Sequence, residues 1–179
     1  MTLRKTLLST LLLSFAIASN VYAETAEEKF SRAVQYDKQQ NYQAAFPIFK
    51  ELAEQGDASS QFNLGLMYNN GDGVSQDYHQ AAKWYQKAAE QGHVDAQFQL
   101  GVMYDKGQGV RQNYQQAFKW VQKAAEQGDA QAQAALGLMY VLGKGVRQNG
   151  AAAEMWIGKA CDNGYRDVCD LYRELNGGK

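Results

Sequence analysis

The sequence holds few residues that could carry out redox or metal chemistry. It contains two cysteines, Cys161 and Cys169, and two histidines, His79 and His93. The cysteines do not form a C-x-x-C motif, and the histidines lie far upstream, with no ligand partner three or four residues further along the chain. We therefore expect no metal and no cofactor. The cysteines are better explained as one structural disulfide than as a redox pair.

Serines are the remaining candidate nucleophiles. Beyond the first 23 residues the chain has Ser31, Ser59, Ser60 and Ser75. None belongs to an S-x-x-K motif, and no S-D-N or K-T-G sequence follows them. Because no recognisable base accompanies a nucleophile, acyl transfer has no support in these residues, and we expect that the protein is not an enzyme.

Glycine triplets could suggest a phosphate-binding loop. They occur at Gly71-Asp72-Gly73, Gly107-Gln108-Gly109 and Gly143-Lys144-Gly145, where each follows a predicted helix rather than a strand. They lack the third glycine and the lysine of a P-loop. We interpret them as helix ends and turns, where a positive φ is needed.

These triplets belong to an internal repeat with a period of 36 residues. An Ala-Glu-Gln-Gly phrase ends at Gly56, Gly92 and Gly128, and tryptophan recurs with the same spacing. A fixed period of this size predicts stacked supersecondary units. The other positions in phase are Leu64-Gly65, Leu100-Gly101 and Leu136-Gly137, then Met67-Tyr68, Met103-Tyr104 and Met139-Tyr140, then Trp84, Trp120 and Trp156.

Each copy is predicted to form two antiparallel helices. Apolar residues have helical spacing from Ala96 to Tyr104 and again from Tyr114 to Ala125. A short polar side chain precedes the second helix of each copy and is expected to cap it. The predicted caps are Asp77, Asn113 and Asn149.

We divide the chain into four parts. Residues 1–23 are a predicted signal peptide, 24–51 a tetratricopeptide-like capping hairpin, 52–159 three 36-residue repeats and 160–179 a partial C-terminal repeat. Within the capping hairpin, Pro47 occupies an outward position, so a kink is expected rather than a break.

The predicted signal peptide has basic residues at Arg4 and Lys5 and an apolar run from Leu7 to Ala18. We expect cleavage between Ala23 and Glu24 and a periplasmic or secreted protein, although an uncleaved anchor is an alternative. Cleavage leaves 16 basic against 19 acidic residues, a net charge of about −3. That charge disfavours nucleic acid as a partner, and no later apolar stretch is long enough for an integral membrane segment.

The pattern A-x-x-x-L-G-x-M-Y, G-x-G-V, A-x-x-W and A-A-E-Q-G resembles Sel1-like repeats, which are relatives of tetratricopeptide repeats. The resemblance runs from about Asp57 to Cys169. It implies an all-α fold, a right-handed α-solenoid of antiparallel helix pairs with a concave surface that binds a protein or peptide partner. It implies no chemistry by itself.

The cysteines add a partial resemblance to the cysteine-rich branch of this family, in which disulfides join the helices of many repeats. Here only the last hairpin, with Cys161 and Cys169, has a pair. Members of that branch have been linked with penicillin binding and weak β-lactam hydrolysis. This activity is the alternative to an exported scaffold that mediates protein–protein interaction in the bacterial envelope or with a host.

In such stacks the first helix of each hairpin lines the concave side. The positions that vary between copies there are candidate ligand contacts, or they vary because nothing constrains them. The pair Val141 and Leu142 replaces polar residues of the earlier copies and would be costly to expose unless the C-terminal hairpin or a partner covers it. The six candidates are Asn63, Asn70, Gln99, Lys106, Ala135 and Leu142.

Overall fold

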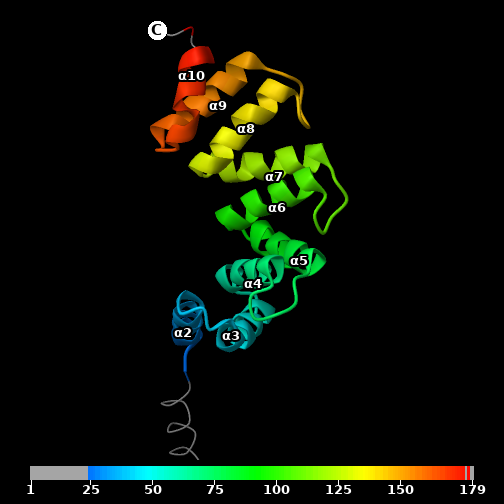
Figure 1. The fold of residues 1–179 in the computed structure, drawn as a ribbon, viewed down its shortest axis with the longest axis vertical. Helices are drawn as coiled ribbons and strands as arrows, with labels where there is room; N and C mark the ends of the chain where they lie inside the picture. Colours follow the sequence, from blue (N-terminus) through cyan, green and yellow to red (C-terminus); the bar gives the residue numbers. More distant parts are fainter. Residues whose placement is uncertain (1–23, 176, 178–179) are drawn as a thin grey trace, which may run out of the picture.

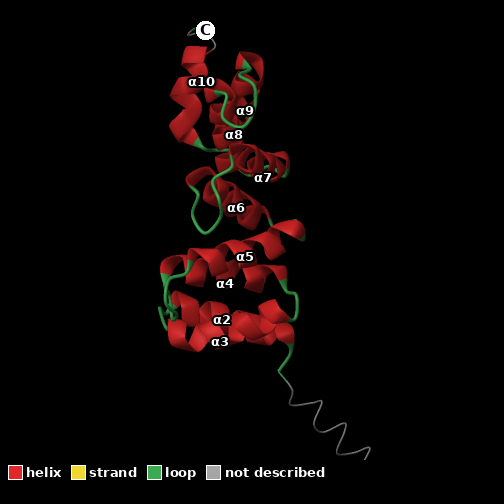
Figure 2. Cartoon of the chain, turned by 90° about the vertical axis from the view of Figure 1, so that its right-hand side faces the viewer, coloured by secondary structure: helices red, strands yellow, loops and turns green. Residues whose placement is uncertain are grey.

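The computed structural model describes residues 24–175 and 177, so the predicted signal peptide lies outside the described residues. Helices joined by loops make up this part of the chain, which has no strand (Figure 2). The predicted all-α solenoid of antiparallel helix pairs is confirmed. The helices are α2 (Ala26–Lys38), α3 (Tyr42–Glu54), α4 (Ala58–Asn70), α5 (Tyr78–Glu90), α6 (Val94–Lys106), α7 (Tyr114–Glu126), α8 (Ala130–Leu142), α9 (Gly150–Asp162), the 3-10 helix η1 (Arg166–Val168) and α10 (Cys169–Leu175).

The hairpins are stacked in chain order along the long axis of the molecule, from α2 at the bottom of Figure 1 to α10 at the top. In each repeat the first helix is α4, α6 or α8 and the second is α5, α7 or α9. The first hairpin, α2–α3, has a shorter link (39–41) than the next one (71–77). It therefore lacks the glycine triplet that links the helices of each repeat.

The helix ends follow the predicted chemistry. Asp77 accepts hydrogen bonds from the backbone N–H groups of His79 and Gln80, and Asn113 and Asn149 cap α7 and α9 in the same way. The first glycine of each triplet has a positive φ and ends the first helix. These glycines are Gly71, Gly107 and Gly143.

The second glycine of a triplet is needed for a different reason. A Cβ atom at Gly109 or Gly145 would lie 2.0 Å from the carbonyl oxygen of Tyr78 or Tyr114, respectively. Each triplet therefore packs against the start of the second helix in the preceding repeat. Only glycine permits this contact between neighbouring hairpins.

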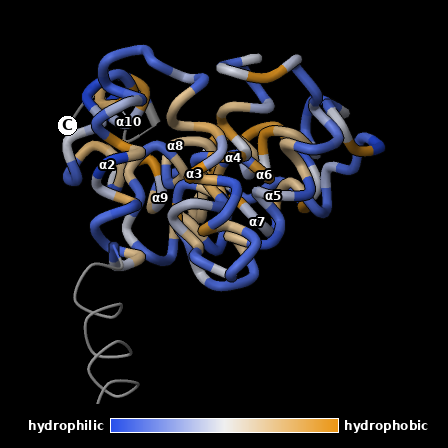
Figure 3. Tube along the Cα trace, turned by 90° about the horizontal axis from the view of Figure 1, so that it is seen from below, coloured by the Kyte–Doolittle hydropathy of each residue, from blue (hydrophilic) through white to orange (hydrophobic). Residues whose placement is uncertain are grey.

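The core consists of small residues that let helices approach and large residues that fill the remaining space. A Cβ at Gly101 would lie 2.7 Å from Cγ2 of Val121, which shows how closely α6 and α7 pack. Alanines such as Ala117 are fully buried, and Trp120 is only 8% exposed. Seen along the stack, the hydrophilic residues lie mostly around the outside (Figure 3). Helix α3 continues through Pro47, which is exposed as expected.

Buried glutamines join successive hairpins. Gln97 is 4% exposed, its Nε2 donates to the carbonyl of Ala89 at 3.1 Å, and its Oε1 accepts from Gln127 Nε2 at 2.7 Å. The same bonds recur one repeat earlier at Gln61, and one repeat later Gln133 accepts from Asn163 Nδ2 instead of from a glutamine. We call Gln61, Gln97 and Gln133 the glutamine clamps.

The C-terminal hairpin has a covalent bond where the repeat pattern would place the next clamp. The structure contains the disulfide between Cys161 and Cys169, with their Cα atoms 5.2 Å apart. Cys169 stands one period after Gln133, and Cys161 one period after Ala125, whose carbonyl Gln133 binds. The disulfide therefore joins α9 to α10 at the point where a glutamine joins the earlier helices.

Candidate binding surface

The six residues predicted to contact a ligand all lie on the first helices of the repeats. Asn63, Gln99 and Ala135 are half-buried, and the other three are exposed. Three of the six line one apolar groove, namely Lys106, Ala135 and Leu142. Asn63, Asn70 and Gln99 lie outside it, and Asn63 and Asn70 donate hydrogen bonds to neighbours within their own repeat. Whether any of the six binds a ligand stays a prediction.

This groove, which we call the α6–α8 groove, has a volume of about 390 Å³. Its walls come from α6 and α8. Its floor comes from α7, which contributes Ala117 and Val121. The other lining residues are Phe98, Gly101, Val102, Asp105, Lys106, Ala135, Leu138, Met139, Leu142 and Lys144.

Aliphatic side chains are exposed at the rim of the groove. Leu142 is 65% exposed and Leu138 is 39% exposed. Val141, on the same helix, is 37% exposed. The C-terminal hairpin therefore does not cover Val141 and Leu142, the apolar pair that replaces polar residues of the earlier copies.

The charges at the groove lie at the C-terminal ends of its walls. Asp105 and Lys144 form an ion pair of 2.7 Å, and each side chain is about one third exposed. The Lys144 ammonium also lies 4.8 Å from the centre of the Tyr114 ring. Lys106 is exposed and forms no ion pair with any residue that the structure describes. Helix α8 contains no charged residue. Because Asp105 and Lys144 neutralise each other, Lys106 gives the groove a positive charge at the C-terminal end of α6.

The Sel1 repeat family model matches residues 58–93, 94–129 and 130–165. The chain belongs to the Sel1 repeat family. Each match begins with the first helix of a hairpin, whereas the division at 52, 88 and 124 begins within the preceding second helix. Sel1 repeats form scaffolds that typically mediate protein–protein interactions.

Solved Sel1 repeat structures have the same fold. A Sel1 repeat protein from Oxalobacter formigenes is 34% identical with a TM-score of 0.79, covering 87% of this chain and 66% of its own length. A protective antigen present in uropathogenic Escherichia coli strains, displaying an SLR fold, is 35% identical with a TM-score of 0.82, over 91% of this chain and 36% of its own. The chain thus spans less than two thirds of either protein.

The cysteine-rich protein B of Helicobacter pylori is more distant. It is 26% identical with a TM-score of 0.55, and the match covers 82% of this chain and 97% of that one. No curated protein matches the sequence.

The Sel1 repeat before the groove shows why the groove is open. At the position of Val121, the preceding repeat has Tyr85, which is 1% exposed and whose ring centre lies 5.8 Å from that of Phe62. A Cβ at Gly65 would lie 2.6 Å from Cδ1 of this tyrosine. The Tyr85 ring therefore fills the space under α4 and α6 that is vacant under α6 and α8.

The Tyr85 hydroxyl makes no favourable polar interaction at this position. It has no hydrogen-bond partner among the described residues, and burial raises the pKa of its phenol well above the ordinary value. Tyr85 is therefore a space-filling residue rather than a polar contact. The sequence shows a tyrosine at 85 and a valine at 121, and a valine at this position is typical of an ordinary core residue.

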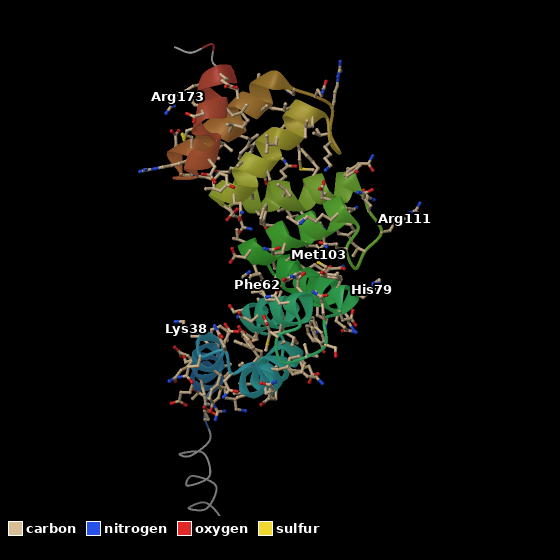
Figure 4. The ribbon with its side chains drawn as sticks, viewed as in Figure 1. Lys38, Phe62, His79, Met103, Arg111 and Arg173 are labelled. Carbon is tan, nitrogen blue, oxygen red and sulfur yellow. A yellow bond between two sulfur atoms is a disulfide. The ribbon has the colours of Figure 1, made fainter. Side chains whose placement is uncertain are left out.

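A larger hollow of about 880 Å³ lies beside the loop before α7, and Arg111 projects outward from that loop (Figure 4). Tyr104, Val110 and Asn113 line it. Their counterparts one period earlier line a similar hollow of about 520 Å³. Because this hollow recurs with the repeat, we interpret it as part of the framework.

The histidines serve the local structure. His79 Nδ1 lies 2.8 Å from the carbonyl oxygen of Gly109 in the next repeat. His93 stacks on Phe62, with ring centres 4.7 Å apart, and caps α6 by accepting from the N–H of Ala96. Burial lowers the pKa of His93, and the negative charges of Asp95 and Asp57 raise it by a smaller amount. No group of three His, Cys, Asp or Glu residues suited to a metal occurs in the described part of the chain.

Proposed function

We propose that this protein is an exported scaffold that binds another protein through the α6–α8 groove. The observation that carries the proposal is the exposure of Leu138 and Leu142 beside an apolar floor. An apolar patch next to a hollow is the usual mark of an interaction site on a protein surface. The family supports the same role, because its repeats typically act as interaction scaffolds.

Export has separate support. Residues 1–23 have the pattern of a signal peptide, and the disulfide between Cys161 and Cys169 suits an oxidising compartment. None of the described helices is long and apolar enough to cross a membrane. The similar Escherichia coli protein is a protective antigen, which favours a location at or beyond the cell envelope for this chain too. We propose a periplasmic or secreted protein.

Site-directed photo-crosslinking in the native bacterium tests the groove as the binding surface. One variant carries a photoreactive amino acid at Leu142, and its matched control carries it at the exposed Lys119 on α7. We expect an adduct with one defined protein from position 142 and none from position 119. Equal adducts from both positions would show that the groove is not the binding surface.

Export is tested by N-terminal sequencing of the protein recovered from the periplasm and the medium. A chain that begins at Glu24 supports cleavage at the predicted site. A chain that retains residues 1–23 in the membrane fraction supports the uncleaved anchor.

The alternative of penicillin binding stays a prediction. Among its candidate nucleophiles, Ser60 is fully buried, and its hydroxyl has no hydrogen-bond partner among the described residues. It therefore has no adjacent base to activate it. Covalent labelling of the folded protein by a fluorescent penicillin would support this alternative, and unlabelled protein would remove it.

A further inference from the structure

We infer that the segment bound in the α6–α8 groove is an amphipathic α-helix that carries a stripe of aliphatic side chains flanked by acidic residues. This inference rests on the proposed function and adds the chemistry of the partner. It follows from three properties of the groove: the length of its walls, the hydrogen bonding of those walls and the charge at one end.

Each wall of the groove is about two helical turns long. On α6 the lining residues Phe98, Val102 and Lys106 follow one another at intervals of one turn, and on α8 Ala135 and Leu142 mark the same length. At a rise of 1.5 Å per residue, each stripe is about 10 to 12 Å long. A partner helix with anchors at i, i+4 and i+7 covers the same length.

The hydrogen bonding of the walls favours a helix over an extended peptide. Apart from Lys144 in the loop after α8, the walls and the floor are α-helices, so most of their backbone groups at the groove are already paired within the helices. An extended peptide would bring its own N–H and C=O groups into an apolar groove whose helical walls offer them few backbone partners. A helix satisfies these groups internally and presents only side chains.

The charge of the groove favours acidic flanks. The Lys144 ammonium neutralises Asp105 at 2.7 Å, which leaves Lys106 as the uncompensated charge of the lining. Helix α8 adds no charge. A glutamate on the partner would be attracted to Lys106, and a lysine would be repelled.

The test uses the mature protein and three synthetic 16-residue peptides, a length of about 24 Å in helical form. All three have leucines at positions 5, 9 and 12, and their exposed positions carry glutamate, lysine or glutamine. Fluorescence anisotropy at low salt measures each Kd. We expect the glutamate peptide to bind about fivefold or more tightly than the lysine peptide.

Two variants locate the binding. Val121→Tyr fills the floor as Tyr85 does in the preceding repeat, beside glycine and phenylalanine at matching positions, so it is expected to fold. Losing one buried anchor should raise the Kd of the glutamate peptide at least about tenfold. Lys106→Glu should reverse the order of the glutamate and lysine peptides. Circular dichroism verifies that both variants remain helical.

The outcomes separate the inference from the proposed function. If the glutamine or lysine peptide binds best and Val121→Tyr abolishes that binding, the groove is a binding site but the acidic partner is overturned. If no peptide binds, or Val121→Tyr has no effect, the helical partner is overturned, while the crosslink from position 142 still decides the groove. Self-association that Val121→Tyr abolishes would make a second copy of the chain the occupant and overturn the inference.

Discussion

Two neighbouring junctions of the stack have the same framework and different surfaces. The junction of α4 and α6 is filled by Tyr85, and the α6 residues one period before Ala135 and Leu142 are Gln99 and Lys106. The junction of α6 and α8 has Val121 at the equivalent position and is open. Its outer wall carries Ala135 and Leu142 in place of the two polar residues. One repeat thus differs from the next by a floor residue and a wall, while the glycines of the triplets and the clamp glutamines stay the same.

This difference shows that a groove can form between two repeats when a large buried side chain is replaced by a smaller one. A smaller floor residue leaves a hollow without disturbing the hydrogen bonds that hold the hairpins together. The glutamine clamps on the two sides have equal geometry, with Nε2 to carbonyl distances of 3.1 Å at both Gln97 and Gln133. The residues that hold the hairpins together are therefore different from the residues that line the groove.

The largest predicted effect comes from making the filled junction resemble the open one. Tyr85→Val removes a buried ring and should lower the free energy of unfolding by about 3 kcal/mol, because the α4–α5 hairpin can collapse only partly. Urea denaturation followed by circular dichroism measures it.

Tyr85→Phe is the matched control. It keeps the ring and removes an unpaired hydroxyl, so the free energy of unfolding should stay equal or rise by about 1 kcal/mol. If Tyr85→Val lowered the free energy of unfolding by less than an ordinary surface substitution does, Tyr85 would not be the residue that fills this junction.

The next effect extends the comparison to the C-terminal junction, where a disulfide takes the place of a clamp. Replacing both Cys161 and Cys169 by alanine should cost about 2 to 3 kcal/mol on the chain-entropy model. Cys161→Ala combined with Cys169→Gln rebuilds the pair found at Ala125 and Gln133. We expect it to recover about 1 kcal/mol in the same urea assay. No recovery would show that the position holds no clamp geometry.

A smaller effect tests whether the two clamps are equivalent. Gln97→Ala and Gln133→Ala should each lower the free energy of unfolding by about 1 to 2 kcal/mol, because each removes a hydrogen bond to the carbonyl of Ala89 or Ala125 and a second one from the side-chain amide of Gln127 or Asn163. The two losses should be similar, since the bonds to the carbonyls have the same length and only the second partner differs, Gln127 for Gln97 and Asn163 for Gln133. The exposed Gln115→Ala serves as the control, with a change near zero. Unequal losses would mean that the open groove weakens its own junction.

The smallest effect concerns the cap of the first helix at each junction. Helix α6 is capped by His93, whereas α8 is capped by Asp129. Because burial lowers the pKa of His93, the unfolded chain binds a proton more readily than the folded one, so stability falls as the pH drops below about 6.5. His93→Asp should remove this dependence and Asp129→His should introduce it, as thermal melts between pH 5 and 8 would show. A pH dependence that survives His93→Asp would have another source.

Most of the framework could be predicted from the sequence. Periodicity marked the helix pairs, and the residue types at Asp77, Asn113 and Gly107 marked the helix ends, because caps and left-handed turns depend on local chemistry. The cysteine pair could be predicted because no third cysteine competes. The clamps were missed, since a buried glutamine and an exposed one read alike in a sequence.

The candidate surface could be predicted only in part. Three of the six predicted residues, Lys106, Ala135 and Leu142, line the groove. Gln99 does not, although it stands one period before Ala135. The repeat pattern assigned equivalent positions to the same surface, but whether a hollow forms there depends on the size of a residue on another helix.

The sequence by itself determined the period, the helical hairpins, their caps and the identity of the only possible disulfide pair. These features depend on short-range chemistry or on a repeat that can be counted. The tertiary structure alone decided which first-helix positions share a groove and which polar side chains are buried. Those properties arise where α6, α7 and α8 meet, and the volume left between three helices depends on all the side chains at their contact.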